Sequence, residues 1–204
     1  MSSSRDVATW TDYYEAYDAR PPREMLLRVL DRFEDPGDAV DLGCGAGIET
    51  AAMLERGWRV VAADEQTEAI DRLRRRVPAG SESRLRTEVA SMETFEPPES
   101  DLVWAAYSLF FCDPDRFADV WARLLAALRP GGRFAGQFLG DRDSWAGDEG
   151  MTWFDRAGVD RLLEPLTVER FMEEEEEGSA CGGPKHWHVF HVVARTPLER
   201  TAIG

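Results

Sequence analysis

The chain has 204 residues, of which 43% are hydrophobic, and a formal net charge of −15 at pH 7. Its length suits one globular domain, and no apolar run approaches the roughly 18 residues of a membrane helix. The acidic balance argues against a polyanionic partner, because proteins that bind nucleic acid usually present a basic surface. We therefore expect a small-molecule or peptide partner, with no nucleic acid and no membrane.

The cysteines and the N-terminal segment predict a cytoplasmic setting. Cys44, Cys112 and Cys181 are odd in number and lack the spacing of a metal or redox motif. The first twenty residues contain no apolar core of a secretory signal. A reducing compartment fits such cysteine usage.

The apolar pattern of the first two thirds alternates helices with strands. Residues 10–34 are expected to be helical and residues 35–38 to form a turn. Strands are then expected at 39–43, 58–64, 85–91 and 133–140, and a further strand is expected to open the stretch 100–111. Helices are expected between them at 48–56, 66–77 and 116–128. Such alternation produces right-handed βαβ units and a mostly parallel sheet.

The C-terminal part predicts a different connection. A helix is expected at 154–163, followed by strands at 166–176 and 185–195 that a short loop joins. Strands joined so closely run antiparallel. We therefore predict an α/β fold with a doubly wound, Rossmann-like, seven-stranded sheet, mostly parallel with the last strand antiparallel, and helices on both faces. We expect one domain over 1–204, with a helical cap at 1–35, a core at 36–195 and a tail at 196–204.

The segment AVDLGCGAGIET, residues 39–50, is the strongest functional signal. Gly43, Gly45 and Gly47 follow the first strand, where ligands of open parallel sheets bind, and glycine lets a ligand touch the backbone. A dinucleotide-binding motif would have glycine where Ile48 stands. A phosphate-binding P-loop would end in Gly-Lys-Ser/Thr, which is absent here.

Two carboxylates indicate which kind of ligand the glycine loop binds. Asp41 precedes Gly43 by two residues, where it would repel a pyrophosphate and suit a cationic, amino-bearing ligand. Asp64 ends the second strand, 17 residues after Gly47, where a carboxylate can accept hydrogen bonds from ribose hydroxyls. The pair predicts a positively charged nucleoside.

The stretches VDLGCGAG, VVAADE and LRPGGRF, with the expected antiparallel seventh strand, resemble the class I S-adenosylmethionine-dependent methyltransferases. The resemblance covers about residues 10–195. The compact single domain looks like the small bacterial enzymes, including the tellurite-resistance-type and thiopurine-type methyltransferases. It implies S-adenosylmethionine as cofactor and a methyl-transfer reaction.

The resemblance also implies roles for individual residues. Many relatives carry an acidic residue where Ala90 or Ser91 stands. In this chain the backbone or Glu93 would therefore bind the adenine amino group. Ala105 to Tyr107, at the end of the fourth strand, would face the sulfonium. The implied cofactor-binding residues are Arg20, Asp41, Gly43, Cys44, Gly45, Gly47, Asp64, Glu65, Ser91, Met92 and Ala106.

Candidates for the acceptor side come from the expected hairpin and from the aromatic residues. The hairpin would turn at the same sheet edge as the glycines, which brings His186 and His188 near the crevice on one strand face. His191 falls on the other face, which argues against a three-histidine metal site, and no metal is expected. The catalytic candidates are His186, His188 and Tyr107, and the acceptor-contact candidates are Tyr13, Tyr17, Phe110 and Trp145, each of which has an alternative role as an ordinary structural residue.

Several functions remain open from the residues alone. The leading hypothesis is a methyltransferase that acts on a small molecule, because the glycine loop, Asp64 and the expected sheet order all indicate it. A protein or tRNA methyltransferase is disfavoured by the acidic charge, and a non-catalytic S-adenosylmethionine-binding module would keep the same loop. No feature of the sequence indicates an oligomeric state.

Overall fold

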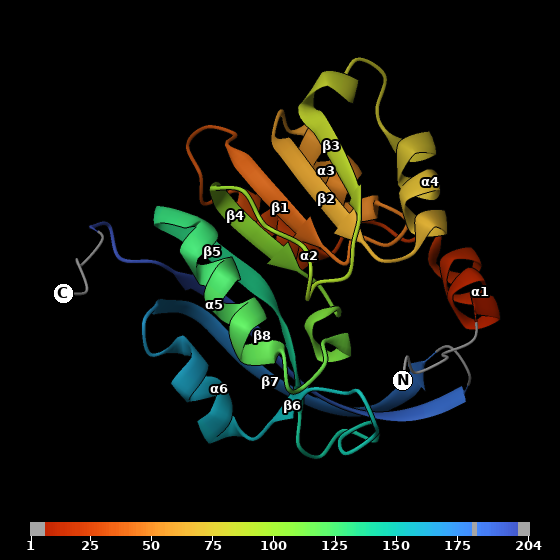
Figure 1. Cartoon of the computed structure of the whole chain (residues 1–204), viewed down its shortest axis with the longest axis vertical. Coiled ribbons are helices and arrows are strands. Elements are labelled where there is room, and N and C mark those ends of the chain that lie inside the picture. Colours follow the sequence, from red (N-terminus) through yellow and green to blue (C-terminus); the bar gives the residue numbers. More distant parts are fainter. Residues whose placement is uncertain (1–6, 181–182, 200–204) are drawn as a thin grey trace.

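The computed structural model describes residues 7–180 and 183–199 and shows one twisted sheet between helices (Figure 1). The strands lie in the order β3-β2-β1-β4-β5-β8-β7, and β6 pairs with β5. Cys181, the first six residues of the expected cap and the last five of the expected tail lie outside the described residues. The strands are β1 (Asp38–Leu42), β2 (Arg59–Asp64), β3 (Leu85–Val89), β4 (Ser100–Ala105), β5 (Leu128–Gly140), β6 (Trp153–Phe154), β7 (Thr167–Ala180) and β8 (Gly183–Arg195).

The directions of the strands confirm the predicted fold class. β8 runs antiparallel to both β5 and β7, and the other pairs of the described sheet are parallel. The central strands are buried on both faces and therefore read as continuous apolar runs, as in the register of Val40 between Val61 and Val103. The eighth strand, β6, was not predicted, because two residues are too few to show a period.

Helices cover both faces of the sheet. Apolar residues of α5 and α6 belong to the core on one face, and those of α2, α3 and α4 to the core on the other. The helices are α1 (Val7–Tyr17), α2 (Glu24–Leu30), α3 (Ile48–Glu55), α4 (Thr67–Arg76), α5 (Phe117–Ala127) and α6 (Arg156–Leu163), with short 3₁₀ turns η1 (Glu82–Arg84) and η2 (Leu109–Phe111).

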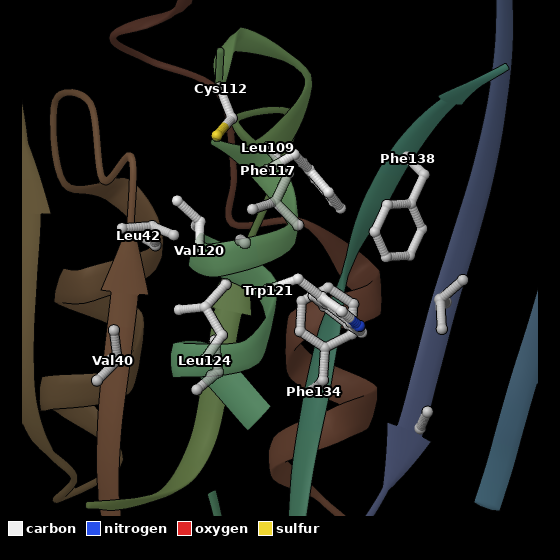
Figure 2. Close-up of a cluster of buried hydrophobic side chains, with 14 of the residues drawn as sticks. Val40, Leu42, Leu109, Cys112, Phe117, Val120, Trp121, Leu124, Phe134 and Phe138 are labelled. Carbon is white, nitrogen blue, oxygen red and sulfur yellow. The ribbon is translucent and has the colours of Figure 1, made fainter. Parts of the chain in front are cut away.

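The core beneath α5 is rich in aromatic side chains (Figure 2). Trp121 projects from α5 onto β5, with its ring centroid 4.8 Å from that of Phe134 and 5.5 Å from that of Phe138. Its indole N–H donates to the carbonyl of Leu162, 3.2 Å away, at the end of α6. A buried polar group is thus satisfied where α5, α6 and the sheet meet.

Several expected boundaries are wrong, and β5 begins at Leu128 instead of residue 133. Two further differences have identifiable reasons. The single helix expected at 10–34 is two helices, because Pro21 and Pro22 offer no backbone N–H and exclude a continuous helix. The loop expected between the last two strands is much shorter, because the ladder continues to the pair Ala180 and Gly183. Glycine and repeated glutamate hide the strand pattern there.

None of the helices in the described part of the chain combines the length and the hydrophobicity needed to cross a membrane.

Candidate active site

A cavity of ≈ 630 Å³ lies beyond the carboxyl ends of β1, β2 and β4. Helix α1, turn η2, the loop after β5 and the far part of the β7–β8 hairpin complete its walls. In Figure 1, α1 and the tip of this hairpin lie on the same side of the molecule as the arrowheads of β1 and β2. The topology therefore brings segments from both ends of the chain to the ligand-binding edge of the sheet.

The glycine loop between β1 and α3 forms one wall of the cavity. Gly47 has φ +79, and a Cβ there would lie 2.5 Å from Cγ of Leu73 in α4, so glycine is required for the loop to pack. Gly45 has φ +51 and would meet only the ring of Tyr14, at 3.7 Å. Gly45 therefore presents bare backbone to the cavity.

Asp64 is fixed beside that bare backbone. Its Oδ2 accepts a hydrogen bond from the Gly45 N–H at 2.9 Å, and its Oδ1 accepts one from the Gln66 N–H at 2.9 Å. Burial raises the pKa of this carboxyl, although the two backbone N–H groups oppose the shift. An anchored carboxylate at the end of β2 is suited to accept hydrogen bonds from a ribose diol.

Asp41 is the second carboxylate of the cavity and is almost fully buried. Its Oδ2 accepts a hydrogen bond from the hydroxyl of Thr50 at 2.5 Å. Burial raises its pKa to about 7, and the nearby charges of Glu49 and Asp64 add to the shift. A cationic ligand group would stabilise the charged form of this carboxyl.

Arg20 reaches the cavity in a bidentate pair with Glu49, at 2.6 and 2.7 Å. The backbone N–H of Arg23 also donates to Glu49, at 3.2 Å, and its guanidinium lies 4.3 Å above the ring of Tyr107. Glu49 thus ties the segment between α1 and α2 to the start of α3. Both arginines line the cavity.

The other residues implied to bind the cofactor line the same cavity, except Ser91. Gly43, Cys44, Gly47, Glu65, Met92 and Ala106 line the cavity. Ser91 is not among its lining residues, whereas its neighbours Ala90 and Glu93 are. A carboxylate oxygen of Glu93 accepts the N–H of Asp113 at 3.0 Å, which holds the loop after β3 against the segment before α5.

Tyr107 occupies an uncommon backbone conformation at the end of β4. Its φ of 54° is the one positive value among described residues other than glycine. The N–H of Tyr107 donates to the buried side chain of Gln137 at 3.0 Å, which holds this conformation. Such strain is often found at functional sites. Burial raises the pKa of the phenol above its ordinary value of 10.0.

The structure places His186 and His188 away from the cavity, which corrects their expected position at its mouth. Neither is among the lining residues. His186 faces Glu175 and Glu177 across the hairpin, at 3.1 and 2.8 Å, and His188 is 3.0 Å from Glu173. Alternate residues of a strand face opposite sides, and the side that contributes to the cavity is that of Trp187 and Val189.

The aromatic residues expected at the acceptor side do line the cavity: Tyr13, Tyr17, Phe110 and Trp145. Sequence reasoning missed Arg23, Asp148, Glu174 and Glu176, which line it as well. Strand alternation from Trp187 through the hairpin register, which pairs it with Glu176, would have identified the two glutamates. Among the described residues, no three His, Cys, Asp or Glu side chains are grouped to hold a metal ion.

Comparison with known proteins agrees with this geometry. The sequence family described as "Methyltransferase domain" matches residues 39–132, which include the glycine loop, Asp64 and β4. The fold is the Rossmann-like fold of methyltransferases of known structure, as the sequence predicts.

Individual relatives carry related names. Trans-aconitate 2-methyltransferase of Sinorhizobium medicae (strain WSM419) is 31% identical over 133 residues, which cover 64% of this chain and 48% of that protein. The chain thus spans about half the length of the curated relatives it matches.

Two solved structures show the likeness of the fold. TehB from Haemophilus influenzae has a TM-score of 0.74 at 13% identity, over 92% of this chain and 67% of that one. The 1,6-didemethyltoxoflavin-N1-methyltransferase of Burkholderia thailandensis, solved with 1,6-didemethyltoxoflavin and S-adenosylhomocysteine, has a TM-score of 0.69 at 21% identity, over 94% and 85%.

Proposed function

We propose that this protein is an S-adenosylmethionine-dependent methyltransferase that acts on a small molecule. The observation that carries the proposal is the bare backbone of Gly45, bonded to the carboxylate of Asp64, in a cavity that the carboxylate of Asp41 also lines. The methyltransferase-domain match and the named relatives support it.

The residues present fit the donor. Asp64 would accept hydrogen bonds from the ribose hydroxyls, and Asp41 would lie near the donor ammonium. Arg20 would face the donor carboxylate, and Glu65 and Met92 would flank the adenine. When bound, S-adenosylmethionine supplies a methyl group that its sulfonium already activates.

The chain's own part in the reaction is then mainly positioning and exclusion of water. Tyr107, Phe110 and Trp145 would close the acceptor end with apolar surface. The neutral hydroxyl of Tyr107 would orient the acceptor through a hydrogen bond. We retain Tyr107 as the catalytic candidate and no longer propose His186 and His188, because their side chains face away from the cavity.

Calorimetry of the purified full chain with S-adenosylmethionine tests the proposal. Binding at micromolar ligand is expected, and the absence of binding at millimolar ligand would contradict it. Methyl turnover on a panel of thiols, oxyanions, phenols and amines then separates an enzyme from a binding module, since only an enzyme releases S-adenosylhomocysteine with the methylated product.

We also propose a cytoplasmic location and no nucleic-acid partner. The cysteine pattern and the acidic charge support these two points. A protein or tRNA acceptor remains the alternative.

A further inference from the structure

Part of the cavity wall, formed by residues that follow β4, by the loop after β5 and by β8, is lined by aromatic rings. Tyr107 lies 5.8 Å from Trp187, and Trp187 lies 5.5 Å from Trp145, measured between ring centroids. Phe110 lies 6.3 Å from Tyr107 and also 6.3 Å from Trp145. These four rings, which we call the aromatic wall, are all lining residues. Such a surface favours a flat, apolar ligand body.

The aromatic wall is held in place by a buried ion pair. Lys185 and Asp143 are both buried and bonded to each other, and the Lys185 ammonium lies 3.7 Å from the ring centroid of Trp145 and 4.3 Å from that of Trp187. Asp143 also accepts the N–H of Trp145 at 2.9 Å. The charge of Lys185 is therefore neutralised behind the wall, and Lys185 is not a lining residue.

Acidic side chains flank this wall on the cavity side. Glu174, Glu176 and Asp148 are lining residues. Glu176 pairs with Trp187 and Glu174 with Val189 across the hairpin, which places both glutamates on the strand face that lines the cavity. Glu174 is 37% exposed and its Oε2 lies 3.5 Å from His191 Nε2.

The lining contains few basic side chains, and one of them reaches the aromatic wall, since the guanidinium of Arg23 lies 4.3 Å from the ring centroid of Tyr107. Among the described lining residues, only Arg20 and Arg23 are basic, and both adjoin Glu49, at 2.6 and 3.9 Å. Two guanidiniums against one carboxylate leave one positive charge, which the donor carboxylate would neutralise. An anionic acceptor would therefore meet carboxylates without an unused cation, whereas a cationic acceptor would meet carboxylates and aromatic faces.

We propose that the acceptor is an aromatic molecule that carries a protonated amine, which Glu174 and Glu176 recognise while its ring lies against the aromatic wall. This inference rests on the proposed function, since it assigns the acceptor class of that same cavity. It separates this chain from the substrate class in the name of its sequence relatives, because trans-aconitate is a polycarboxylate.

Calorimetry of the full chain saturated with S-adenosylhomocysteine tests it with three probes. These are tryptamine, which is cationic, indole-3-acetate, which is anionic on the same ring, and trans-aconitate. We expect tryptamine to bind about tenfold more tightly than indole-3-acetate, because two partly exposed carboxylates face the charged group. Trans-aconitate is expected to bind most weakly.

Charge-neutral variants show whether Glu174 and Glu176 cause the preference for tryptamine. The double variant Glu174→Gln/Glu176→Gln should reduce the preference for tryptamine to about threefold or less. The matched control is Glu175→Gln, which lies between them on the opposite strand face and pairs with Arg142 and His186, and it should leave the preference unchanged.

Each other outcome overturns the inference. Tighter binding of indole-3-acetate or trans-aconitate, no binding of tryptamine, or a preference that survives in the double variant would contradict the acceptor class while S-adenosylhomocysteine still binds. Failure of S-adenosylhomocysteine itself to bind would contradict the proposed function and this inference with it.

Discussion

Asp41 shows how a single buried carboxylate can serve binding at the expense of stability. Its pKa of about 7 in the folded chain exceeds the ordinary value of 3.8. Between about pH 4 and pH 7 the folded state keeps a proton that the unfolded state loses, so this group lowers stability as the pH rises through that window. Above pH 7 the carboxylate is charged in both states, and the free energy of unfolding stays lowered by the full cost of burying that charge.

Asp41→Asn removes that buried charge. At pH 8 we expect the ligand-free variant to gain about 1 kcal/mol, or about 2–4 °C in Tm for a chain of this size. Its affinity for S-adenosylhomocysteine should fall about tenfold, since a charged hydrogen bond is lost. Thermal unfolding and calorimetry measure the two effects. At pH 5 the gain in Tm should be smaller, and it should vanish only near pH 4, below the unfolded pKa. A loss of stability at pH 8 would contradict the account.

Gly47 is constrained by both its backbone and its neighbour in α4. Gly47→Ala should lower the free energy of unfolding by about 2–4 kcal/mol, because a strained φ and a clash with Leu73 add. Gly80→Ala is the matched control: its φ is +82 with no atom within 4 Å, so only about 1 kcal/mol of strain is expected. Urea denaturation compares them, and equal losses would show that packing at Gly47 does not matter.

At this scale the sequence predicts which residues line the cavity better at the glycine loop than on the hairpin. The glycines and Asp64 are recognisable because they lie at the end of a short buried strand or directly after it. The orientation of Glu174, Glu176, His186 and His188 depends on the register of β7 with β8, whose ladder extends to Ala180 and Gly183 through glycines and glutamates that show no strand pattern. Without that register, an assignment of strand faces can be reversed.

Among the elements, the loop between β5 and β6 depends on one buried ion pair. Asp143 bonds Lys185, accepts the N–H of Trp145 and accepts the N–H of His188 at 3.0 Å. Asp143→Ala should therefore cost about 3–5 kcal/mol, because it leaves an ammonium buried without a partner.

The double variant Asp143→Ala/Lys185→Met provides the control for that prediction. It should recover most of the loss, since no buried charge remains. Urea denaturation of the two single variants and the double variant forms a complete cycle. Additive losses in the double variant would show that the two side chains stabilise the fold independently.

The elements themselves were predictable where their pattern is long. The apolar stripe of α5 and the buried runs of β1, β2 and β4 extend over several residues and are found close to their expected positions. The break between α1 and α2 was missed because the apolar stripe predicts a continuous helix. Pro21 and Pro22, which end a helix, were the stronger signal. β6 is defined by a pairing with β5 and by nothing in its own two residues.

On the scale of the whole molecule, the net charge of −15 separates the small-molecule hypothesis from a tRNA acceptor. We expect no retention of tRNA on filters by the purified protein, even at low salt, where electrostatic binding is strongest. Retention that weakens as salt is added would instead favour the tRNA alternative.

The central claim is that the backbone at Gly45 and the carboxylate of Asp64 together bind an S-adenosyl nucleoside. Calorimetry with S-adenosylhomocysteine, on the wild-type chain and on Asp64→Ala, tests it most directly, with Asp71→Ala on the exposed side of α4 as control. The account predicts that Asp64→Ala weakens binding by about 1.5–3 kcal/mol and that the control binds like the wild type. Unchanged binding by Asp64→Ala, or no binding by the wild type, would contradict it.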